Sequence, residues 1–153
     1  MAGTFSQIYI QVVFAVKNRD SLINPEWEER LYQYMTGIVR RKEQKMLAIN
    51  GTHNHIHFFI GMKPSCSLSD LVREVKKSSN DFIKDNSLSK FKFSWQEGFG
   101  AFSYSHSQID NVIKYVMNQK EHHRKVSFKE EYIDFLKKFE IEHDEKYLFD
   151  WID

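Results

Sequence analysis

The 153-residue sequence is poor in the residues that define several classes of protein. Its single cysteine, Cys66, excludes an internal disulfide framework and a cysteine-based zinc cluster. Only six glycines and two prolines are present, which argues against a fibrous or disordered chain. No apolar run approaches the roughly 20 residues of a membrane span, and the start lacks a basic segment followed by an apolar one. We therefore expect a cytoplasmic protein without membrane contacts.

Neither sign of charge dominates, because the formal net charge is only +1. Acidic residues crowd toward the C-terminal end, so a local basic surface remains compatible with that total. Aromatic residues are abundant at 15%, with 13 Phe and 7 Tyr. This supply and the chain length predict one domain over residues 1–153 with a substantial core. The last twelve or so residues are expected to form a loosely docked tail.

The hydrophobic pattern predicts strands and helices in a recognisable order. Strands are expected over 5–16, 46–50, 55–61 and 99–105, which are rich in β-branched and aromatic residues. Helices are expected over 24–43, over 68–83, from Ser107 and from Ser127, the last two with capping-box spacing. The order β-α-β-β-α-β predicts a ferredoxin-like α+β fold. It has an antiparallel sheet, helices on one face, and C-terminally a tyrosine-bearing helix and a further helix.

Three histidines, His53, His55 and His57, occupy alternate positions in "HNHIH". Alternate side chains of a strand point the same way, so the three imidazoles are expected to share one face. Such a group is either the polar side of a structural strand or the floor of a metal site. Imidazoles clustered without a metal gain nothing obvious and repel one another when protonated. Both interpretations stay open from these residues alone.

The segment "YVMNQ", residues 115–119, places Tyr115 and Gln119 one helical turn apart on the same face. A tyrosine beside an apolar stripe is most often a core residue. Taken with the histidines, however, it suggests phosphoryl transfer, which needs a metal and a nucleophile in line with the phosphate. A tyrosine nucleophile stores a broken phosphodiester as an ester that another hydroxyl can take up. That chemistry suits the breaking and rejoining of strands.

These residues carry a resemblance to a known family. "HIH", residues 55–57, resembles the His-hydrophobic-His motif of HUH endonucleases, and "YVMNQ" resembles the tyrosine-helix motif of their single-tyrosine transposase branch. The stretches "SQIYIQVVFAVKNR", "QEGFGAFSYS" and "NQKEHHRKVSFKEEY" are also similar to this family, so the resemblance spans roughly residues 4 to 140. Its members are small transposases of insertion sequences that move as single-stranded DNA, with relatives that act on repetitive extragenic palindromes.

The resemblance implies a function and a role for several residues. The protein would be a DNA transposase that cleaves and rejoins single-stranded DNA at hairpin-marked ends through a 5′-phosphotyrosine intermediate. Tyr115 would be the nucleophile, and His55, His57 and Gln119 would bind Mg²⁺ or Mn²⁺, with His53 as a possible extra ligand. Family members are dimers, so a homodimer is expected, with the tyrosine helix acting in cis or in trans. Asn54 stands where the family commonly has Asp.

Basic residues suggest two places for DNA contact. They are Arg73, Lys76 and Lys77 in the second helix, and Lys120, His122, His123 and Arg124 after the tyrosine helix. Two other functions remain as alternatives. One is a non-catalytic or domesticated protein that binds nucleic-acid hairpins, and the other is a zinc hydrolase built on His53, His55 and His57.

Overall fold

The computed structural model describes residues 3–152. Four strands form one antiparallel sheet in the order β2-β3-β1-β4. They are β1 (Ile8–Ala15), β2 (Lys45–Gly51), β3 (His55–Met62) and β4 (Gly100–Tyr104). Since β1 pairs with both β3 and β4, the two central strands come from the first and third strand segments of the chain. This order is that of the ferredoxin-like α+β fold and confirms the predicted class.

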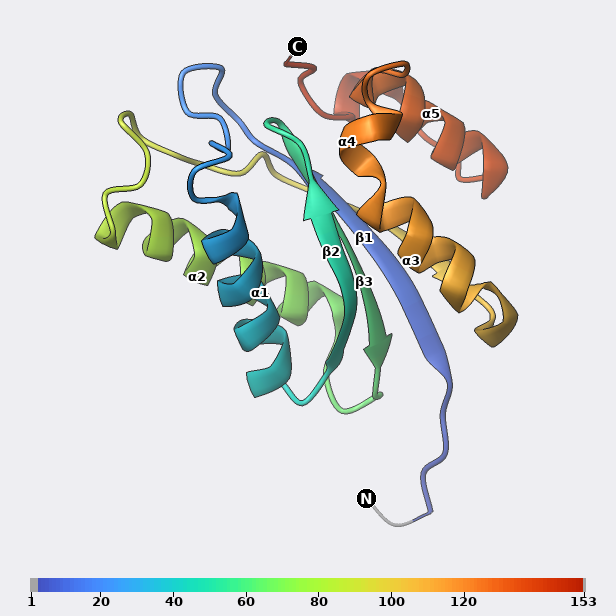
Figure 1. Cartoon of the computed structure of the whole chain (residues 1–153). Helices are drawn as coiled ribbons and strands as arrows, with labels where there is room; N and C mark the ends of the chain where they lie inside the picture. Colours follow the sequence, from blue (N-terminus) through green and yellow to red (C-terminus); the bar gives the residue numbers. More distant parts are fainter. Residues whose placement is uncertain (1–2, 153) are drawn as a thin grey trace.

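Helices cover the two faces of the sheet (Figure 1). One face carries α1 (Glu28–Arg41) and α2 (Leu68–Asp85). The other carries α3 (Ile109–Met117), α4 (Gln119–His122) and α5 (Phe128–Lys138). Two 3-10 turns, His106–Gln108 and Glu145–Tyr147, complete the elements of the described residues. No helix among them is both long enough and apolar enough to cross a membrane.

Strand alternation decides which side chains face which helices. Within β3, Phe58 is buried against Phe14 of β1 in the core under α1 and α2. The alternate residues His57 and Phe59 face the opposite layer, where Phe59 packs with Val112 and Val116 of α3. One strand therefore serves an apolar core on one side and a polar site on the other.

Two helices begin later than the sequence predicts. Asn24 accepts a hydrogen bond from the Glu26 amide within a turn, and α1 begins at Glu28. Ser107 does not cap α3, because Ser105 has the extended backbone of a cap and forms a capping box with Gln108 instead. The Ser127 box with Glu130 is confirmed at the start of α5.

The turn between β2 and β3 corrects the prediction for His53. A Cβ on Gly51 would lie 2.2 Å from the carbonyl oxygen of His55, so the chain reverses too tightly there for any side chain. His53 lies in this turn with its side chain exposed, and β3 begins only at His55. The shared strand face therefore holds two imidazoles instead of three.

The C-terminal residues are docked more firmly than a loose tail. Phe149 and Ile152 are buried, and the Phe149 ring lies 5.9 Å from the Phe128 ring. The Gln96 side chain accepts a hydrogen bond from the Asp150 amide and donates one to its carbonyl, both at 2.7 Å. These contacts fasten the end of the chain beside α5 and next to the start of β3.

Candidate active site

Four side chains converge between the sheet and α5. His55 and His57 come from β3, His123 follows α4, and Glu131 lies in the first turns of α5. One ligating atom of each lies within 4.8 Å of those of the others. The Oε1 of Glu131 is 2.9 Å from the Nε2 of His57 and 3.0 Å from the Nε2 of His123. We call these four residues the His/Glu cluster.

Hydrogen bonds on the far side of each imidazole assign its tautomer. The Nδ1 atoms of His55, His57 and His123 each lie 2.7 Å from an oxygen, supplied by Asn54 Oδ1, Gln11 Oε1 and the Val126 carbonyl. Since these oxygens accept, each Nδ1 carries the proton and each Nε2 keeps its lone pair. All three lone pairs are turned toward Glu131.

This arrangement suits a divalent cation. Three nitrogen lone pairs point at a carboxylate oxygen, and all four groups are hydrogen-bond acceptors. Their mutual repulsion is unfavourable unless a positive charge lies among them. The Oε1 of Gln119 adds a fifth oxygen or nitrogen donor, 3.1 Å from the Nε2 of His55. Imidazole nitrogens with carboxylate and amide oxygens form a ligand set used by divalent metals in proteins. The residues present therefore fit the metal that the sequence predicts.

Tyr115 lies at the edge of the His/Glu cluster. Its hydroxyl donates a hydrogen bond to Oε2 of Glu131, the same oxygen that accepts from Gln119 Nε2 at 2.9 Å. The Tyr115 ring lies 6.0 Å from the His57 ring. Because α3 packs on β2 and β3 of its own chain, the tyrosine and the histidines meet within a single chain.

The charge of Glu131 dominates the electrostatics of the site. Burial alone would raise the pKa of this carboxyl, but the neighbouring imidazoles of His57, His123 and His55 outweigh burial and hold the pKa well below the ordinary range. Burial raises the pKa of Tyr115 above its usual value, and the Glu131 charge raises it further. The cluster therefore holds an ionised carboxylate beside a protonated phenol.

The structure brings together His55, His57, Gln119 and Tyr115, as the sequence led us to expect. His53 lies outside the His/Glu cluster. His123 was predicted to contact DNA but lies in the cluster, and His122 lies at its edge, 3.4 Å from Glu131. Sequence reasoning missed Glu131, although a signal was there: it stands three residues after Phe128 and four before Phe135, on the apolar side of α5.

The residues predicted for DNA contact on α2 lie across the sheet from Tyr115 (Figure 1). The ammonium of Lys76 is turned inward and donates hydrogen bonds to the carbonyls of Gln96 and Gly98. Burial lowers the pKa of Lys76 to about 8. Arg73 is exposed and paired with Asp70 at 2.8 Å, and Lys77 is exposed.

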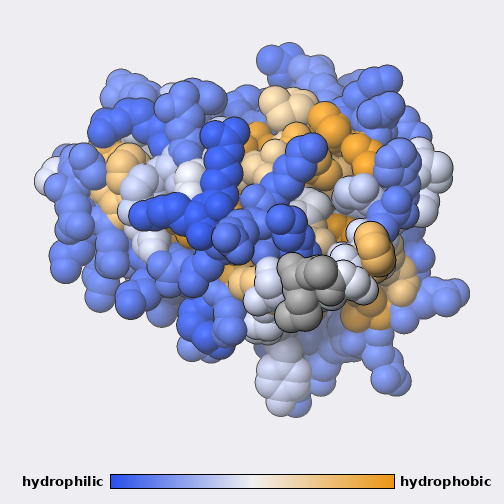
Figure 2. Space-filling model, turned by 90° about the horizontal axis from the view of Figure 1, so that it is seen from below, coloured by the Kyte–Doolittle hydropathy of each residue, from blue (hydrophilic) through white to orange (hydrophobic). Residues whose placement is uncertain are grey.

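Basic residues after α3 lie nearer the site. Lys120 donates to the Asn50 side chain at 2.9 Å and pairs with Glu28 at 3.3 Å, while Arg124 is exposed and paired with Glu121. The basic residues of segment 40–45 lie at the opposite end of the sheet from His55. Lys45 pairs with Gly61 near the end of β3, whereas His55 is the first residue of that strand. Figure 2 shows that hydrophilic side chains cover most of that lower end, with the largest apolar area on one side.

Acid should destabilise the metal-free protein through His55. Burial lowers the pKa of His55 to about 3, against an ordinary value of 6.5. Between these values the unfolded chain binds a proton that the folded chain does not, so stability is full above 6.5 and is lost toward pH 3. We expect this residue to contribute a slope of about 1.4 kcal/mol per pH unit. Urea unfolding in a chelator from pH 7 to 4 measures it; His55→Gln should flatten the slope, and the exposed His143→Gln should not.

Asn54 connects His55 to the end of the chain. Its Oδ1 accepts from His55 Nδ1, and its Nδ2 donates to the carbonyl of Ile152. Asn54→Asp would restore the residue common in the family, yet it removes the donor and sets two acceptors face to face. We expect a loss of about 1–2 kcal/mol of stability and faster amide exchange over residues 149–152. Hydrogen exchange and urea unfolding check this, with the exposed Asn118→Asp as control. Unchanged exchange would refute the connection.

The fold and the cluster together define a small α+β protein with a tyrosine beside a candidate metal site. The chain belongs to the family described as IS200-like transposase, whose model matches residues 4–119. This membership confirms the family expected from "HIH" and "YVMNQ". The matched residues include His55, His57, Tyr115 and Gln119, whereas His123 and Glu131 lie beyond them.

Solved structures share the fold at low sequence identity. One is a Deinococcus radiodurans R1 protein assigned as a transposase, with a TM-score of 0.61 and 16% identity, covering 78% of this chain and 95% of that one. Another is a REP-associated tyrosine transposase bound to a REP hairpin, with a TM-score of 0.58 and 15% identity, covering 100% of this chain and 94% of that one. None of the curated proteins compared matches the chain.

Proposed function

We propose that this transposase cleaves and rejoins single-stranded DNA at hairpin-marked ends through a covalent bond to Tyr115. The observation that carries the proposal is the Tyr115 hydroxyl bonded to Glu131 at the edge of the His/Glu cluster, all within one chain. Family membership supports the transposase role. A neighbour of the same fold binds a REP hairpin, which supports a hairpin as the DNA partner here.

His55, His57 and Gln119 would hold the metal, as the family resemblance implies, and His123 and Glu131 would complete its ligands. A divalent cation bound there polarises a phosphate oxygen and offsets the charge that builds up on the phosphate. Either Mg²⁺ or Mn²⁺ would serve, and the imidazole nitrogens favour Mn²⁺ by ligand softness. Gln11 and Asn54 hold the imidazoles so that their Nε2 atoms face the site.

The residues of the chain account for the transfer itself. The Tyr115 oxygen attacks phosphorus and forms a phosphotyrosine bond, while the bond from phosphorus to the 3′ oxygen breaks and that oxygen takes a proton from water and leaves as a hydroxyl. The Tyr115 proton lies on a hydrogen bond to Glu131 Oε2, the group placed to receive it. Attack by another 3′ hydroxyl re-forms the phosphodiester and restores the tyrosine. Without a cation, burial and the Glu131 charge keep Tyr115 protonated, so the nucleophile is inactive until the metal binds.

A covalent-adduct assay tests the proposal. The protein is incubated with end-labelled single-stranded hairpin DNA carrying the palindromes that flank its gene, in Mg²⁺ or Mn²⁺. We expect a labelled protein band that survives boiling in detergent, depends on the metal, and maps by mass spectrometry to the peptide containing Tyr115. Double-stranded DNA of the same sequence should give no band. A metal-dependent cut without a protein adduct would refute the tyrosine mechanism.

The two alternatives are less well supported. A protein that only binds hairpins needs no buried carboxylate among three imidazole lone pairs next to a tyrosine, and that arrangement carries an electrostatic cost. A zinc hydrolase built on His53, His55 and His57 disagrees with the exposed position of His53 in the β2–β3 turn. The homodimer remains a prediction for light scattering, since the cluster and the tyrosine already meet within one chain.

A further inference from the structure

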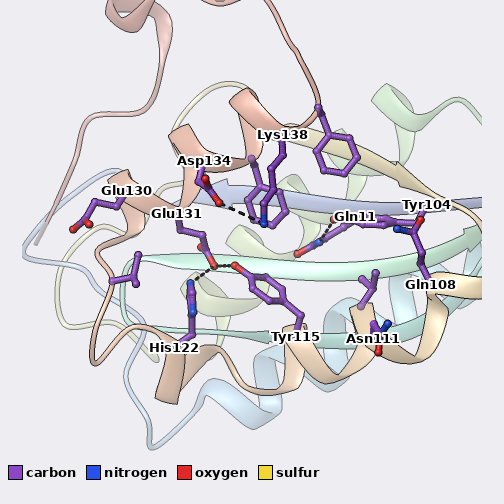
Figure 3. A pocket seen from close by; sticks show the side chains of 14 residues that line it. Gln11, Tyr104, Gln108, Asn111, Tyr115, His122, Glu130, Glu131, Asp134 and Lys138 are labelled. Atoms are coloured by element: carbon purple, nitrogen blue, oxygen red, sulfur yellow. Dashed lines mark hydrogen bonds and ion pairs between the residues drawn. The ribbon is translucent and has the colours of Figure 1, made fainter.

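A cavity of about 790 Å³ opens beside Tyr115, between α3 and α5 (Figure 3). Tyr115 and Glu131 form part of its wall, so the cavity begins at the proposed nucleophile. Gln11 and Tyr104 line it from β1 and β4. Its volume falls within the roughly 300–1,000 Å³ of pockets that hold small organic ligands. We call it the α3/α5 pocket.

Aromatic rings supply the apolar part of the α3/α5 pocket. Tyr104, Phe135 and Phe139 line it together with Tyr115. The Tyr104 and Phe139 rings lie 5.5 Å apart in an edge-to-face arrangement, and the Tyr115 and Phe135 rings lie 5.7 Å apart in a similar one. A flat heterocycle can stack on such rings whatever its identity, because every base has a π face.

The polar groups of the pocket favour a ligand that donates hydrogen bonds. Three carboxylates line it, from Glu130, Glu131 and Asp134, against one ammonium, from Lys138, which lies 3.6 Å from Asp134. Figure 3 shows this Asp134–Lys138 pair and the Glu131–Tyr115 contact together in the pocket. An excess of negative charge repels a phosphate and accepts N–H groups.

Two side-chain amides of the pocket differ in whether they are free to bind a ligand. Gln11 is fully buried and already bonded to His57 and to the Tyr104 hydroxyl, so it holds the catalytic imidazole. Asn111, by contrast, is exposed on α3 and lines the pocket opposite α5. An exposed amide and the carboxylate of Asp134 thus face the same space from two helices.

We propose that the α3/α5 pocket binds the unpaired base of a nucleotide next to the scissile phosphate, and that it selects bases carrying an exocyclic amino group. The proposal rests on the proposed function, because it assumes a phosphate at the Tyr115 hydroxyl. A base joined to that phosphate must lie within one nucleotide of Tyr115, and the pocket is the cavity that adjoins the hydroxyl on this side. Guanine, adenine and cytosine present N–H₂ groups to the carboxylates, whereas thymine presents mainly carbonyl acceptors.

Adduct selection from a random library tests the pocket. The protein is incubated with hairpin DNA whose flanking single strand is randomised, and the strands that become covalently attached are sequenced. Depletion of thymine at one position adjacent to the cut is expected for the wild type. Asp134→Asn should relax this selection roughly 5- to 150-fold at that position alone, since one good base contact discriminates by about that much. Asp110→Asn removes a matched exposed charge from α3 outside the pocket and should change nothing.

A nucleoside titration separates failure of the pocket from failure of the proposed function. Deoxyguanosine, deoxyadenosine, deoxycytidine and thymidine are titrated into the full chain in chelator, followed by NMR of the Asn111 side-chain amide. Weaker binding of thymidine, and loss of this difference in Asp134→Asn, support the pocket even if no adduct ever forms. Adducts with no base selection, together with equal binding of the four nucleosides, overturn the pocket and leave the tyrosine mechanism standing. Selection that Asp134→Asn leaves unchanged also overturns it.

Discussion

Tyr115→Phe is expected to abolish covalent attachment to DNA and with it all strand cleavage. The phenyl ring keeps the packing against His57, His122 and Phe135, so the fold and the metal site should survive. What is lost is the oxygen that the mechanism uses as the nucleophile for cleavage, so the expected effect is a fall below detection, on the order of 10³-fold or more. Labelled adduct and free cleaved strand are both measured, because a water-driven cut would appear only in the second.

The matched control is Tyr147→Phe, which removes a hydroxyl from a tyrosine that is 79% exposed and belongs to the C-terminal segment. It should form adduct at the wild-type rate. Binding of hairpin DNA by Tyr115→Phe should stay within about threefold of wild type, since the hydroxyl is one contact among many to the backbone. An adduct that persists in Tyr115→Phe would move the nucleophile to another side chain.

The fold could be predicted because its signals are local. Alternation in β1 and β3 and the apolar stripes of α1 and α2 each identify an element without knowledge of the others. The starts of α1 and α3 differ from the prediction because Asn24 and Ser107 carry cap-forming side chains, while the cap positions belong to Trp27 and Ser105. The His53 error has the same origin. Alternate residues share a face only within a strand. Because β2 ends at Gly51, His53 lies in the turn and outside both strands.

The site could be predicted only where a motif keeps its residues at fixed spacing. Tyr115 and Gln119 lie four residues apart and stay close although the helix breaks at Asn118 between α3 and α4. His55 and His57 lie two residues apart on a strand, so short spacing along the chain predicts each pair. Glu131 and His123 join them through long-range contacts, 74 residues apart for His57 and Glu131. Spacing along the chain does not predict contacts between residues so far apart in the sequence. The carboxylate of Glu131 on the apolar side of α5 could have indicated a functional residue. Glutamates are common in the first turn of a helix, however, because they interact favourably with the helix dipole.

Asn54 illustrates how one residue serves two distant parts of the fold. An aspartate would be the stronger acceptor for the His55 proton, yet only an amide can also donate to the carbonyl of Ile152. The departure from the common family residue is therefore matched by a contact with the C-terminal segment. Fold prediction from the sequence missed this because it considered the tail and the histidine strand as separate features.

Glu131→Gln is expected to weaken metal binding strongly while sparing the metal-free fold. The substitution keeps the shape of the side chain and removes the one full negative charge of the His/Glu cluster. Loss of residues that only support ligands typically costs 10- to 100-fold in affinity, so loss of a charged ligand should cost about 100-fold or more. Titration of Mn²⁺ against a fluorescent chelator measures the affinity directly, without DNA and without turnover.

The metal-free stability of Glu131→Gln makes the test specific. In the wild type, the carboxylate faces three imidazole lone pairs and shares no proton with them in their assigned tautomers, whereas a glutamine amide can donate to one. The loss of the ionised carboxylate and the gain of an amide donor oppose each other, so the free energy of unfolding in chelator should stay within about 1 kcal/mol of wild type, while the stabilisation gained on adding Mn²⁺ disappears. Glu29→Gln, on the exposed side of α1, is the matched control and should keep both properties. If Glu131→Gln bound Mn²⁺ as well as wild type, the carboxylate would be a hydrogen-bond acceptor for Tyr115 and Gln119 and not a metal ligand.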